Sequence, residues 1–258
     1  EDQNMQMRGT ALVTGAAKRI GRAIAEDLAA NGFAVVIHAN RSFEAAEALA
    51  AELKDGGAVA HAVQADLFDT DATRMLAEKA VALAGQPIDL LVNNASVFEN
   101  DAIDTLDEGV WDRHFAVHVK APAFLSEAVA ANLPEGRHGL IVNMIDQRVW
   151  RLTPNFFSYT LSKSTLWTAT QTMAQALAPA IRVNAIGLGP TLKSPRQSEE
   201  DFAKQAQAVP LQHGAKLGEI GATIRYLWEN RSITGQMIAL DGGQHLAWET
   251  PDVADIAE

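Results

Sequence analysis

The sequence has no cysteine and no apolar run long enough to cross a membrane as a helix. Without thiolates the chain has no disulfide framework, no cysteine zinc site, no iron–sulfur cluster and no cysteine nucleophile. A membrane helix needs about 18 or more consecutive apolar residues, and no charged leader followed by an apolar stretch opens the chain. We therefore expect a globular, cytoplasmic protein that does not bind membranes.

Positive charge is also scarce, with 21 Lys and Arg against 32 Asp and Glu and a net charge of −11. This is the wrong sign for a general nucleic-acid binder. Proline- and serine-rich linkers, repeats and low-complexity tracts are absent as well. We expect a single domain over residues 1–258, in which residues 1–8 form an N-terminal tail.

Short, continuous apolar runs alternate with helical patterns that end at Gly or Pro. Continuous apolar runs are typical of strands covered on both faces. The fold class is therefore α/β: a Rossmann-like, doubly wound parallel sheet of about seven strands with helices on both faces. The expected strands are Ala11–Val13, Phe33–Ala39, Ala58–Val63, Ile88–Val92, Leu140–Ile145, Ile181–Ile186 and Met237–Leu240. The main helices are expected over 20–31, 42–54, 69–84, 107–132 with a kink at Pro122, 157–177 and 219–228.

The stretch Leu188–Gln207 is polar and rich in Pro, Ser and charge. Loops of this length inside a compact domain are typically lids or disordered segments. Because it follows the carboxyl end of a strand, where open α/β sheets bind ligands, we expect a substrate lid or loop over 188–207. The alternative is a surface insertion.

The first expected strand runs into Thr14–Gly21, with the sequence TGAAKRIG, which opens the first helix. Gly15 permits a tight turn, Gly21 permits close packing of helix on strand, and the helix N-terminus offers N–H groups to a pyrophosphate. The strand before and the helix after make this a specific signal for a dinucleotide site.

The second expected strand indicates which nicotinamide cofactor is bound. Residues 33–43 contain no Asp or Glu to bond a ribose 2′-OH, whereas Arg41 and Ser42 offer a cation and a hydroxyl to a 2′-phosphate. We expect NADPH (NADP) as cofactor. Ser42 also suits the N-cap of the next helix. Asp66 either accepts from the adenine amino group or caps the helix that follows it.

Tyr159 and Lys163 stand four residues apart on one expected helix and so share a face. A neighbouring ammonium favours the phenolate, so we expect Lys163 to lower the pKa of Tyr159 and make it a better proton donor near neutral pH. The same ammonium can hold the nicotinamide ribose.

Together these motifs resemble the short-chain dehydrogenase/reductase family, and the resemblance runs from Thr10 to Leu246. It implies a Rossmann-like fold, hydride transfer from a nicotinamide and a homotetramer. The matching motifs are TGxxxxxG at Thr14–Gly21, NNA at Asn93–Ala95, YxxxK at Tyr159–Lys163, RVN at Arg182–Asn184 and LDGG at Leu240–Gly243.

Several departures narrow the resemblance. Arg19 stands where most members have Gly, Asp146 replaces the catalytic Ser thirteen positions before Tyr159, and Phe98 follows the NNA motif. With the HxxRS of His38–Ser42 these look like the pteridine reductase branch. His118, at the position of the usual relay Asn, and the late GGQHL resemble its bacterial relatives, the dihydromonapterin and dihydrofolate reductases. Leu188 replaces the proline usual before Gly189.

The resemblance also implies roles for individual residues. Asp146, Tyr159 and Lys163 would be catalytic, and Phe98 would stack on the pterin ring opposite the nicotinamide. Arg19, Ser96, Phe98, Asp146 and Tyr159 would contact substrate. Tyr159 and Lys163 would also contact the cofactor, and no metal is implied. The remaining cofactor contacts would be Gly15, Lys18, Arg19, Ile20, Asn40, Arg41, Ser42, Asp66, Leu67, Asn94, Ala95, Ser96, Gly189 and Thr191.

The chemistry of Asp146 and Phe98 also favours a pterin-like substrate. A Ser hydroxyl can donate to a ketone oxygen, whereas an ionised Asp only accepts, so Asp146 suits a substrate with N–H groups or a ring nitrogen. Burial that keeps Asp146 protonated is a second possibility, and a turn or cap role is a third. Phe98 offers a flat apolar face, or else caps the core from a loop. His118 is either a proton relay or a hydrogen-bonded helix histidine.

We therefore expect an NADPH-dependent oxidoreductase that reduces a C=N bond of a pterin, dihydropterin or dihydrofolate. One alternative is reduction of a ketone, sugar or acyl carbonyl, against which Asp146 and Phe98 argue. A non-catalytic NADPH-binding sensor is the other, and the Tyr159–Lys163 pair argues against it. The expected partners are a pterin-like small molecule and further copies of the chain.

Overall fold

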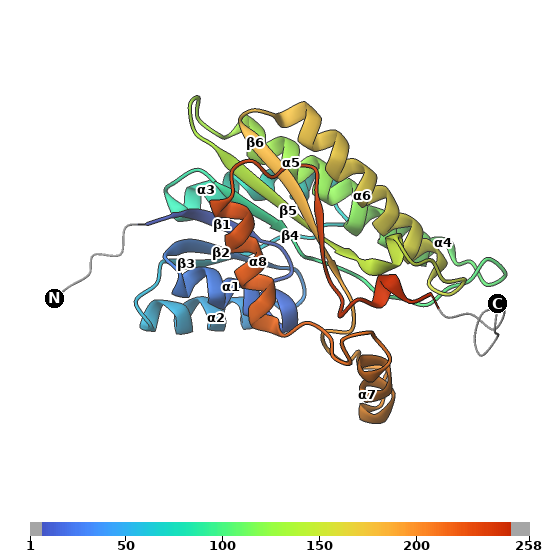
Figure 1. The fold of residues 1–258 in the computed structure, drawn as a ribbon. Helices are drawn as coiled ribbons and strands as arrows, with labels where there is room; N and C mark the ends of the chain where they lie inside the picture. The colour runs from blue at the N-terminus through green and yellow to red at the C-terminus, as the bar shows by residue number, and fades with distance from the viewer. Residues whose placement is uncertain (1–6, 249–258) are drawn as a thin grey trace, which may run out of the picture.

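The computed structural model describes residues 7–248, in which seven strands form one parallel sheet (Figure 1). The strand order is β3-β2-β1-β4-β5-β6-β7. The strands are β1 (Gly9–Val13), β2 (Phe33–Ala39), β3 (Ala60–Gln64), β4 (Leu90–Asn93), β5 (Gly139–Asp146), β6 (Ile181–Leu188) and β7 (Met237–Leu240). The predicted Rossmann-like sheet is confirmed. Residues 1–6 of the expected tail, and residues 249–258 of the expected domain, lie outside the described residues.

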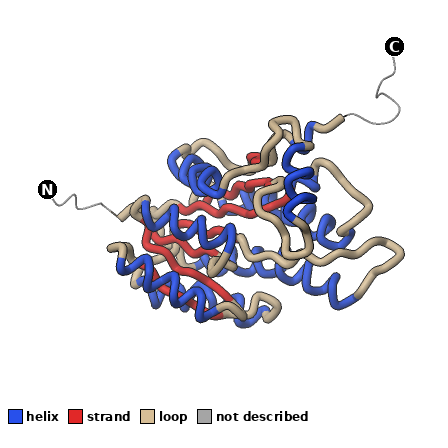
Figure 2. The backbone as a smooth tube through the Cα atoms, turned by 90° about the horizontal axis from the view of Figure 1, so that it is seen from below, coloured by secondary structure: helices blue, strands red, loops and turns tan. Residues whose placement is uncertain are grey.

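Helices cover both faces of the sheet, and the strands lie between them in Figure 2. One layer holds α1, α2 and α8, and the other holds α3 to α6. The helices are α1 (Arg19–Ala30), α2 (Phe43–Asp55), α3 (Thr70–Ala84), α4 (Glu108–Phe115), α5 (Ala121–Ala131), α6 (Phe157–Leu177), α7 (Glu199–Gln207) and α8 (Leu217–Glu229).

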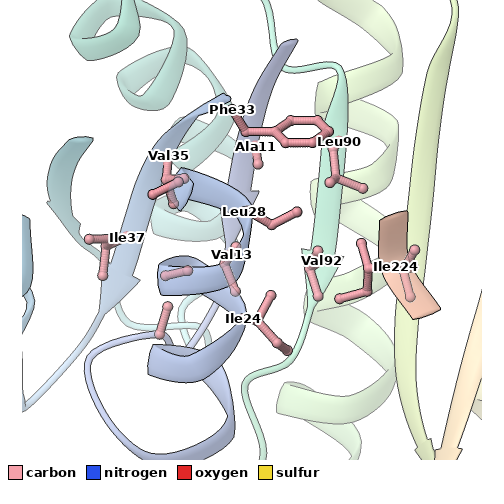
Figure 3. Close-up of a cluster of buried hydrophobic side chains, with 14 of the residues drawn as sticks. Ala11, Val13, Ile24, Leu28, Phe33, Val35, Ile37, Leu90, Val92 and Ile224 are labelled. Atoms are coloured by element: carbon pink, nitrogen blue, oxygen red, sulfur yellow. The ribbon is translucent and has the colours of Figure 1, made fainter. Parts of the chain in front are cut away.

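Each face of the sheet carries its own apolar core. Figure 3 shows Ile24 and Leu28 of α1 and Ile224 of α8 packed near Val13 and Val92 of the sheet, all fully buried. Burying a side chain of this size contributes about 1.5–3 kcal/mol. Because both faces are covered, the strands read as continuous apolar runs, and that is why they could be found in the sequence.

The position of the binding crevice follows from the strand order. β1 and β4 are neighbours in the sheet, and the chain leaves the carboxyl end of β1 toward α1 on one face and the carboxyl end of β4 toward α4 on the other. Val13 lies beside Val92 in this register, which brings Thr14 next to the chain that leaves β4. The Thr14 hydroxyl accepts from the N–H groups of Asn94 and Ala95, at 3.0 Å each. The two predicted motifs therefore meet at one edge of the sheet.

The expectation of a polar loop over Leu188–Gln207 is wrong at both ends. Leu188 is the last residue of β6, and Glu199–Gln207 form α7, which projects from the body in Figure 1. The sequence of α7 carries no apolar stripe, and none of its residues is buried. The helix start was nevertheless readable, because Ser198 caps the N–H of Asp201 at 3.0 Å.

The expected helix over residues 107–132 is interrupted. A π turn, Ala116–Lys120, joins α4 to α5 just before Pro122. Pro122 has no N–H to donate to the carbonyl of His118, and its ring would crowd that carbonyl in a regular helix. The irregularity therefore precedes the proline.

The two candidate helix caps have different outcomes in the structure. Asp69, and not Asp66, caps α3 by accepting from the N–H groups of Asp71 and Ala72. Ser42 stands at the N-cap position of α2 but makes no side-chain capping bond. Within residues 7–248, no helix combines the length and the apolar character needed to cross a membrane.

Candidate active site

Two cavities open at the carboxyl edge of the sheet, and they share Arg19, Ile20, Asn94 and Ser96. The larger, about 1000 Å³, is also lined by the predicted residues Gly15, Lys18, Asn40, Arg41, Asp66, Leu67 and Ala95. The smaller, about 370 Å³, is also lined by Phe98, Asp146, Tyr159, Lys163, Gly189 and Thr191. Of the predicted site residues, Ser42 alone lines neither cavity.

The glycine turn forms the floor of the larger cavity. Gly15 has φ +60°, a left-handed conformation that glycine adopts without strain. A Cβ on Gly21 would overlap the carbonyl oxygen of Gly15, so the close approach expected of this glycine is present. A cavity of this size, floored by backbone at a helix N-terminus, fits a dinucleotide.

His38 holds this turn against the sheet. Its Nδ1 accepts from the N–H of Gly15 at 3.2 Å, and its Nε2–H donates to the carbonyl of Ala65 at 3.1 Å. Both bonds need the neutral imidazole. Burial lowers the pKa of His38 to about 4, so the ring is neutral at physiological pH.

Arg19 occupies a backbone conformation that suits glycine. Its φ is +56°, which costs a residue with a side chain roughly 1–2 kcal/mol. This explains physically why glycine would be the common residue there. In return, the guanidinium reaches across the site and donates to the carbonyl of Lys193 at 2.9 Å. Arg19 therefore joins the glycine turn to the segment after β6.

Tyr159 and Lys163 of α6 are buried side by side in the smaller cavity. Lys163 Nζ donates to the carbonyl of Met144 at 2.9 Å and lies 5.8 Å from the centre of the Tyr159 ring. Burial lowers the pKa of Lys163 to about 8.

The expectation that the pKa of Tyr159 is lowered by Lys163 is wrong for the protein alone. Burial raises the pKa of Tyr159 well above its usual value, and the charge of Asp146 raises it further. Sequence reasoning considered only the ammonium of Lys163, whereas desolvation of the phenolate and the nearby carboxylate dominate. Tyr159 is consequently a protonated phenol at neutral pH.

Asp146 ends β5 and faces this phenol. Its Oδ2 accepts from Tyr159 Oη at 3.1 Å and from Arg148 Nη1 at 3.0 Å, while its Oδ1 accepts from the Arg148 N–H at 2.9 Å. The last bond caps the 3₁₀ turn Gln147–Val149. The capping role, one of the alternatives raised by the sequence, is therefore present beside a hydrogen bond with Tyr159.

His118 lies in the π turn, buried behind the site. Its Nε2 accepts from the Val97 N–H at 3.2 Å and bonds the Ser96 hydroxyl at 2.9 Å, so the ring proton sits on Nδ1. Nδ1 donates to the Ser162 hydroxyl at 2.8 Å. Burial holds the pKa of His118 well below its usual value, with the charge of Lys163 adding to the effect. His118 thus ties the loop after β4 to α6 as a neutral ring.

Phe98 forms the aromatic wall of the smaller cavity. Its ring stacks on Phe156 with centroids 4.4 Å apart and 9° between the planes, and meets Tyr159 edge-on at 4.7 Å. Phe156 thus covers one face of the ring that was expected to stack on a pterin. That stacking stays a prediction.

Sequence reasoning missed several residues that line the smaller cavity. Arg148 and Phe156 lie on the segment between β5 and α6, and others lie on or before α7. A signal for Arg148 and Phe156 was their place between Asp146 and Tyr159, two residues that were already singled out. The lining residues that were not predicted as site residues are Met144, Ile145, Gln147, Arg148, Phe156, Leu188, Pro190, Leu192, Ser194, Arg196, Gln197, Phe202, Gln205 and Gln244.

A parallel sheet with this turn and this tyrosine–lysine pair defines an oxidoreductase that uses a dinucleotide. The chain belongs to the short chain dehydrogenase family, whose family model matches residues 9–204. The resemblance found in the sequence is therefore confirmed.

Within this family, two solved structures show a high sequence identity to the chain. The chain is 59% identical to FolM alternative dihydrofolate reductase 1 from Brucella canis, complexed with NADP, with a TM-score of 0.94 over 97% of this chain and 99% of that one. The Brucella suis protein, also in complex with NADP, is 60% identical, with a TM-score of 0.93 over 96% and 99% of the two chains. A 3-oxoacyl-[acyl-carrier-protein] reductase of Staphylococcus aureus is 29% identical over 94% of this chain and 100% of its own length. The likeness to the two Brucella proteins supports the predicted pteridine-reductase-like branch.

Proposed function

We propose that this protein is an NADPH-dependent reductase that reduces a C=N bond in the ring of a dihydropterin or dihydrofolate. The observation that carries the proposal is the carboxylate of Asp146, 3.1 Å from the Tyr159 hydroxyl in a cavity walled by Phe98. An ionised carboxylate accepts from the N–H groups of a pterin and cannot donate to a ketone oxygen. The high identity to the two Brucella reductases supports the same assignment.

The larger cavity is the proposed cofactor site. Arg41 and Asn40 line it at the end of β2, where no acid faces a ribose hydroxyl, and both Brucella structures are described as complexes with NADP. Gly15, Lys18, Arg19, Ile20, Asp66, Leu67, Asn94, Ala95, Ser96, Gly189 and Thr191 would complete the site, with Ser42 beside Arg41. Once bound, NADPH supplies the hydride to the ring carbon of the C=N bond.

The residues of the chain handle the accompanying proton. Because the raised pKa of Tyr159 keeps its hydroxyl protonated, Tyr159 holds a proton for the ring nitrogen. Asp146 accepts from the ring N–H groups or orients a water that delivers the proton instead. Arg148 lowers the pKa of Tyr159 and so opposes the effect of Asp146 on the phenolate left after transfer. Ser96 and Arg19 contact the polar edge of the ring.

Residues 188–207 form the proposed substrate lid, since Leu188 to Gln205 supply several walls of the smaller cavity. The protein is further proposed to be a single cytoplasmic domain that assembles as a homotetramer with dihedral symmetry. Leu246 and Trp248, 64% and 74% exposed at the end of the described chain, support an interface there. Light scattering at micromolar concentration checks the assembly, and a monomer mass contradicts it.

The decisive assay follows loss of NADPH absorbance with dihydrobiopterin, dihydromonapterin, dihydrofolate, an acetoacetyl thioester and a simple ketone. The proposal expects turnover with the first three. Turnover confined to the thioester or the ketone would instead assign carbonyl reduction, the activity named for the Staphylococcus relative. Tight NADPH binding without oxidation by any member of the panel would assign a sensor.

A further inference from the structure

The smaller cavity has an unusual charge for this protein. Arg19, Lys163, Arg148 and Arg196 line it, and Asp146 is the one carboxylate among its lining residues. The whole chain carries a net charge of −11. A cation-rich pocket attracts an anionic ligand, which the net negative charge of the rest of the protein would repel.

The cofactor does not account for all of this charge. Arg19 also lines the larger cavity, and Lys163 is assigned to the nicotinamide ribose. Arg148 and Arg196 line the smaller cavity and not the larger one. These two guanidinium groups are thus not accounted for by the proposed cofactor site.

Both of these guanidinium groups lie against the aromatic wall. The Arg148 Cζ is 5.4 Å, and the Arg196 Cζ 5.3 Å, from the centre of the Phe98 ring. Arg196 also donates to the carbonyl of Phe98, which fixes it beside the ring. Arg148 is already paired with Asp146, whereas Arg196 makes no ion pair within residues 7–248. Arg196 is exposed, so it stands where the cavity meets solvent.

We propose that the substrate carries a carboxylate on a tail attached to its ring, and that Arg196 binds this carboxylate at the mouth of the cavity. The planar fork of an arginine matches a carboxylate through two parallel hydrogen bonds. A ring held beside Phe98 leaves its tail pointing to solvent past Arg196, while Arg148 adds positive charge behind it. This rests on the proposed function and selects within it: a pteroylglutamate such as dihydrofolate is preferred over a dihydropterin with an uncharged tail.

The test compares Arg196→Gln with wild type on dihydrofolate and on dihydrobiopterin, whose tail is uncharged. An ion pair at an exposed site is screened by solvent, so its loss predicts about a two- to fivefold fall in kcat/KM for dihydrofolate. The fall for dihydrobiopterin is expected to be smaller, because only the support of Phe98 is lost. Arg196→Lys keeps the charge without the fork and should lie between the two.

Lys204→Gln is the matched control. Lys204 lies on α7, 69% exposed and paired with Glu200, and does not line the cavity. The Lys204→Gln substitution removes the same unit of charge from the same segment. An effect of net charge alone would therefore lower kcat/KM equally in Lys204→Gln and Arg196→Gln. In wild type, KM for dihydrofolate should rise with ionic strength more steeply than KM for dihydrobiopterin.

A binding measurement completes the design. Calorimetric titration of the NADP⁺ complex with folate should show weaker binding in Arg196→Gln, while the affinity for NADP⁺ itself is little changed. Equal losses on both substrates, or a matching loss of NADP⁺ affinity, would overturn the proposal and assign Arg196 to general structure or to the cofactor. If neither pterin is turned over by wild type, the proposed function fails instead, and the folate titration still reports on Arg196.

Discussion

Replacing Asp146 by Ser gives the sharpest test of the proposed chemistry. The change removes a carboxylate that accepts three hydrogen bonds, from Tyr159 Oη, the Arg148 N–H and Arg148 Nη1. It restores the residue that the wider family is expected to use for carbonyls. Asp146→Asn is the matched variant, because it keeps the shape of the side chain while a neutral amide, with one accepting oxygen and one donating nitrogen, replaces the charged carboxylate.

The magnitude follows from the contacts. A hydrogen bond to a charged group is worth about 1.5–3 kcal/mol, and the Asp146 side chain is only 16% exposed, so solvent screens it little. If one such bond to the ring N–H groups forms at the transition state, its loss lowers kcat/KM for a dihydropterin by about ten- to 150-fold. Asp146 does not line the larger cavity, so the dissociation constant for NADPH should change less than about threefold.

The pH profile provides an independent readout. Asp146 raises the pKa of Tyr159 both by its charge and by its hydrogen bond. In Asp146→Ser and Asp146→Asn the pKa of Tyr159 should therefore fall, and the alkaline limb of the rate should move to lower pH. Burial, the larger cause, is unchanged, so the limb moves only part of the way.

Steady-state kinetics over a pH range, with fluorescence titration of NADPH, measure all three quantities. Unchanged pterin turnover in both variants refutes the proposed role of the Asp146 carboxylate. Carbonyl reduction then becomes the favoured activity. An alkaline limb that stays in place refutes the coupling to Tyr159.

Three further predictions follow from the same geometry. Arg41→Ala should weaken NADPH binding about tenfold or more and leave NADH binding nearly unchanged, since only NADPH carries the 2′-phosphate; equal losses in titrations of the two cofactors contradict this. Tyr159→Phe should lower turnover by about 10²–10⁴-fold with NADPH binding intact, and near-normal single-turnover rates would make water the direct proton donor. His38, with its pKa lowered from 6.5 to about 4, stabilises the fold above pH 6.5 and loses that contribution as the pH falls toward 4, about 3 kcal/mol in all. Urea unfolding at the two ends of this range should show less pH dependence in His38→Gln than in wild type, and equal dependence contradicts the assignment.

The sheet could be predicted from the sequence because its strands are buried on both faces. Phe33–Ala39 reads as an apolar run with one polar residue, His38, and forms β2 with those bounds. The glycine turn was equally legible, because Gly15 and Gly21 are demanded by backbone geometry at their own positions. Local rules of this kind act over a few residues and need no knowledge of the rest of the chain.

The errors have a common physical origin in contacts between distant segments. Burial and Asp146 set the direction of the Tyr159 pKa, and neither is visible from the spacing of Tyr159 and Lys163. Arg196 stands 98 positions from Phe98, and only the folded chain brings them together. The π turn at Ala116–Lys120 also escaped prediction, because proline signals an irregularity without saying which kind replaces the regular helix.

Arg19 belongs to the walls of both cavities at once. If the two cavities hold substrate and cofactor as proposed, a substitution of Arg19 should change both affinities. Double-mutant cycles that pair Arg19 with Arg41 and with Arg196 should both depart from additivity. An attempt to change the nicotinamide preference by design should begin at Asn40 and Arg41, which line the larger cavity alone, and leave position 19 untouched.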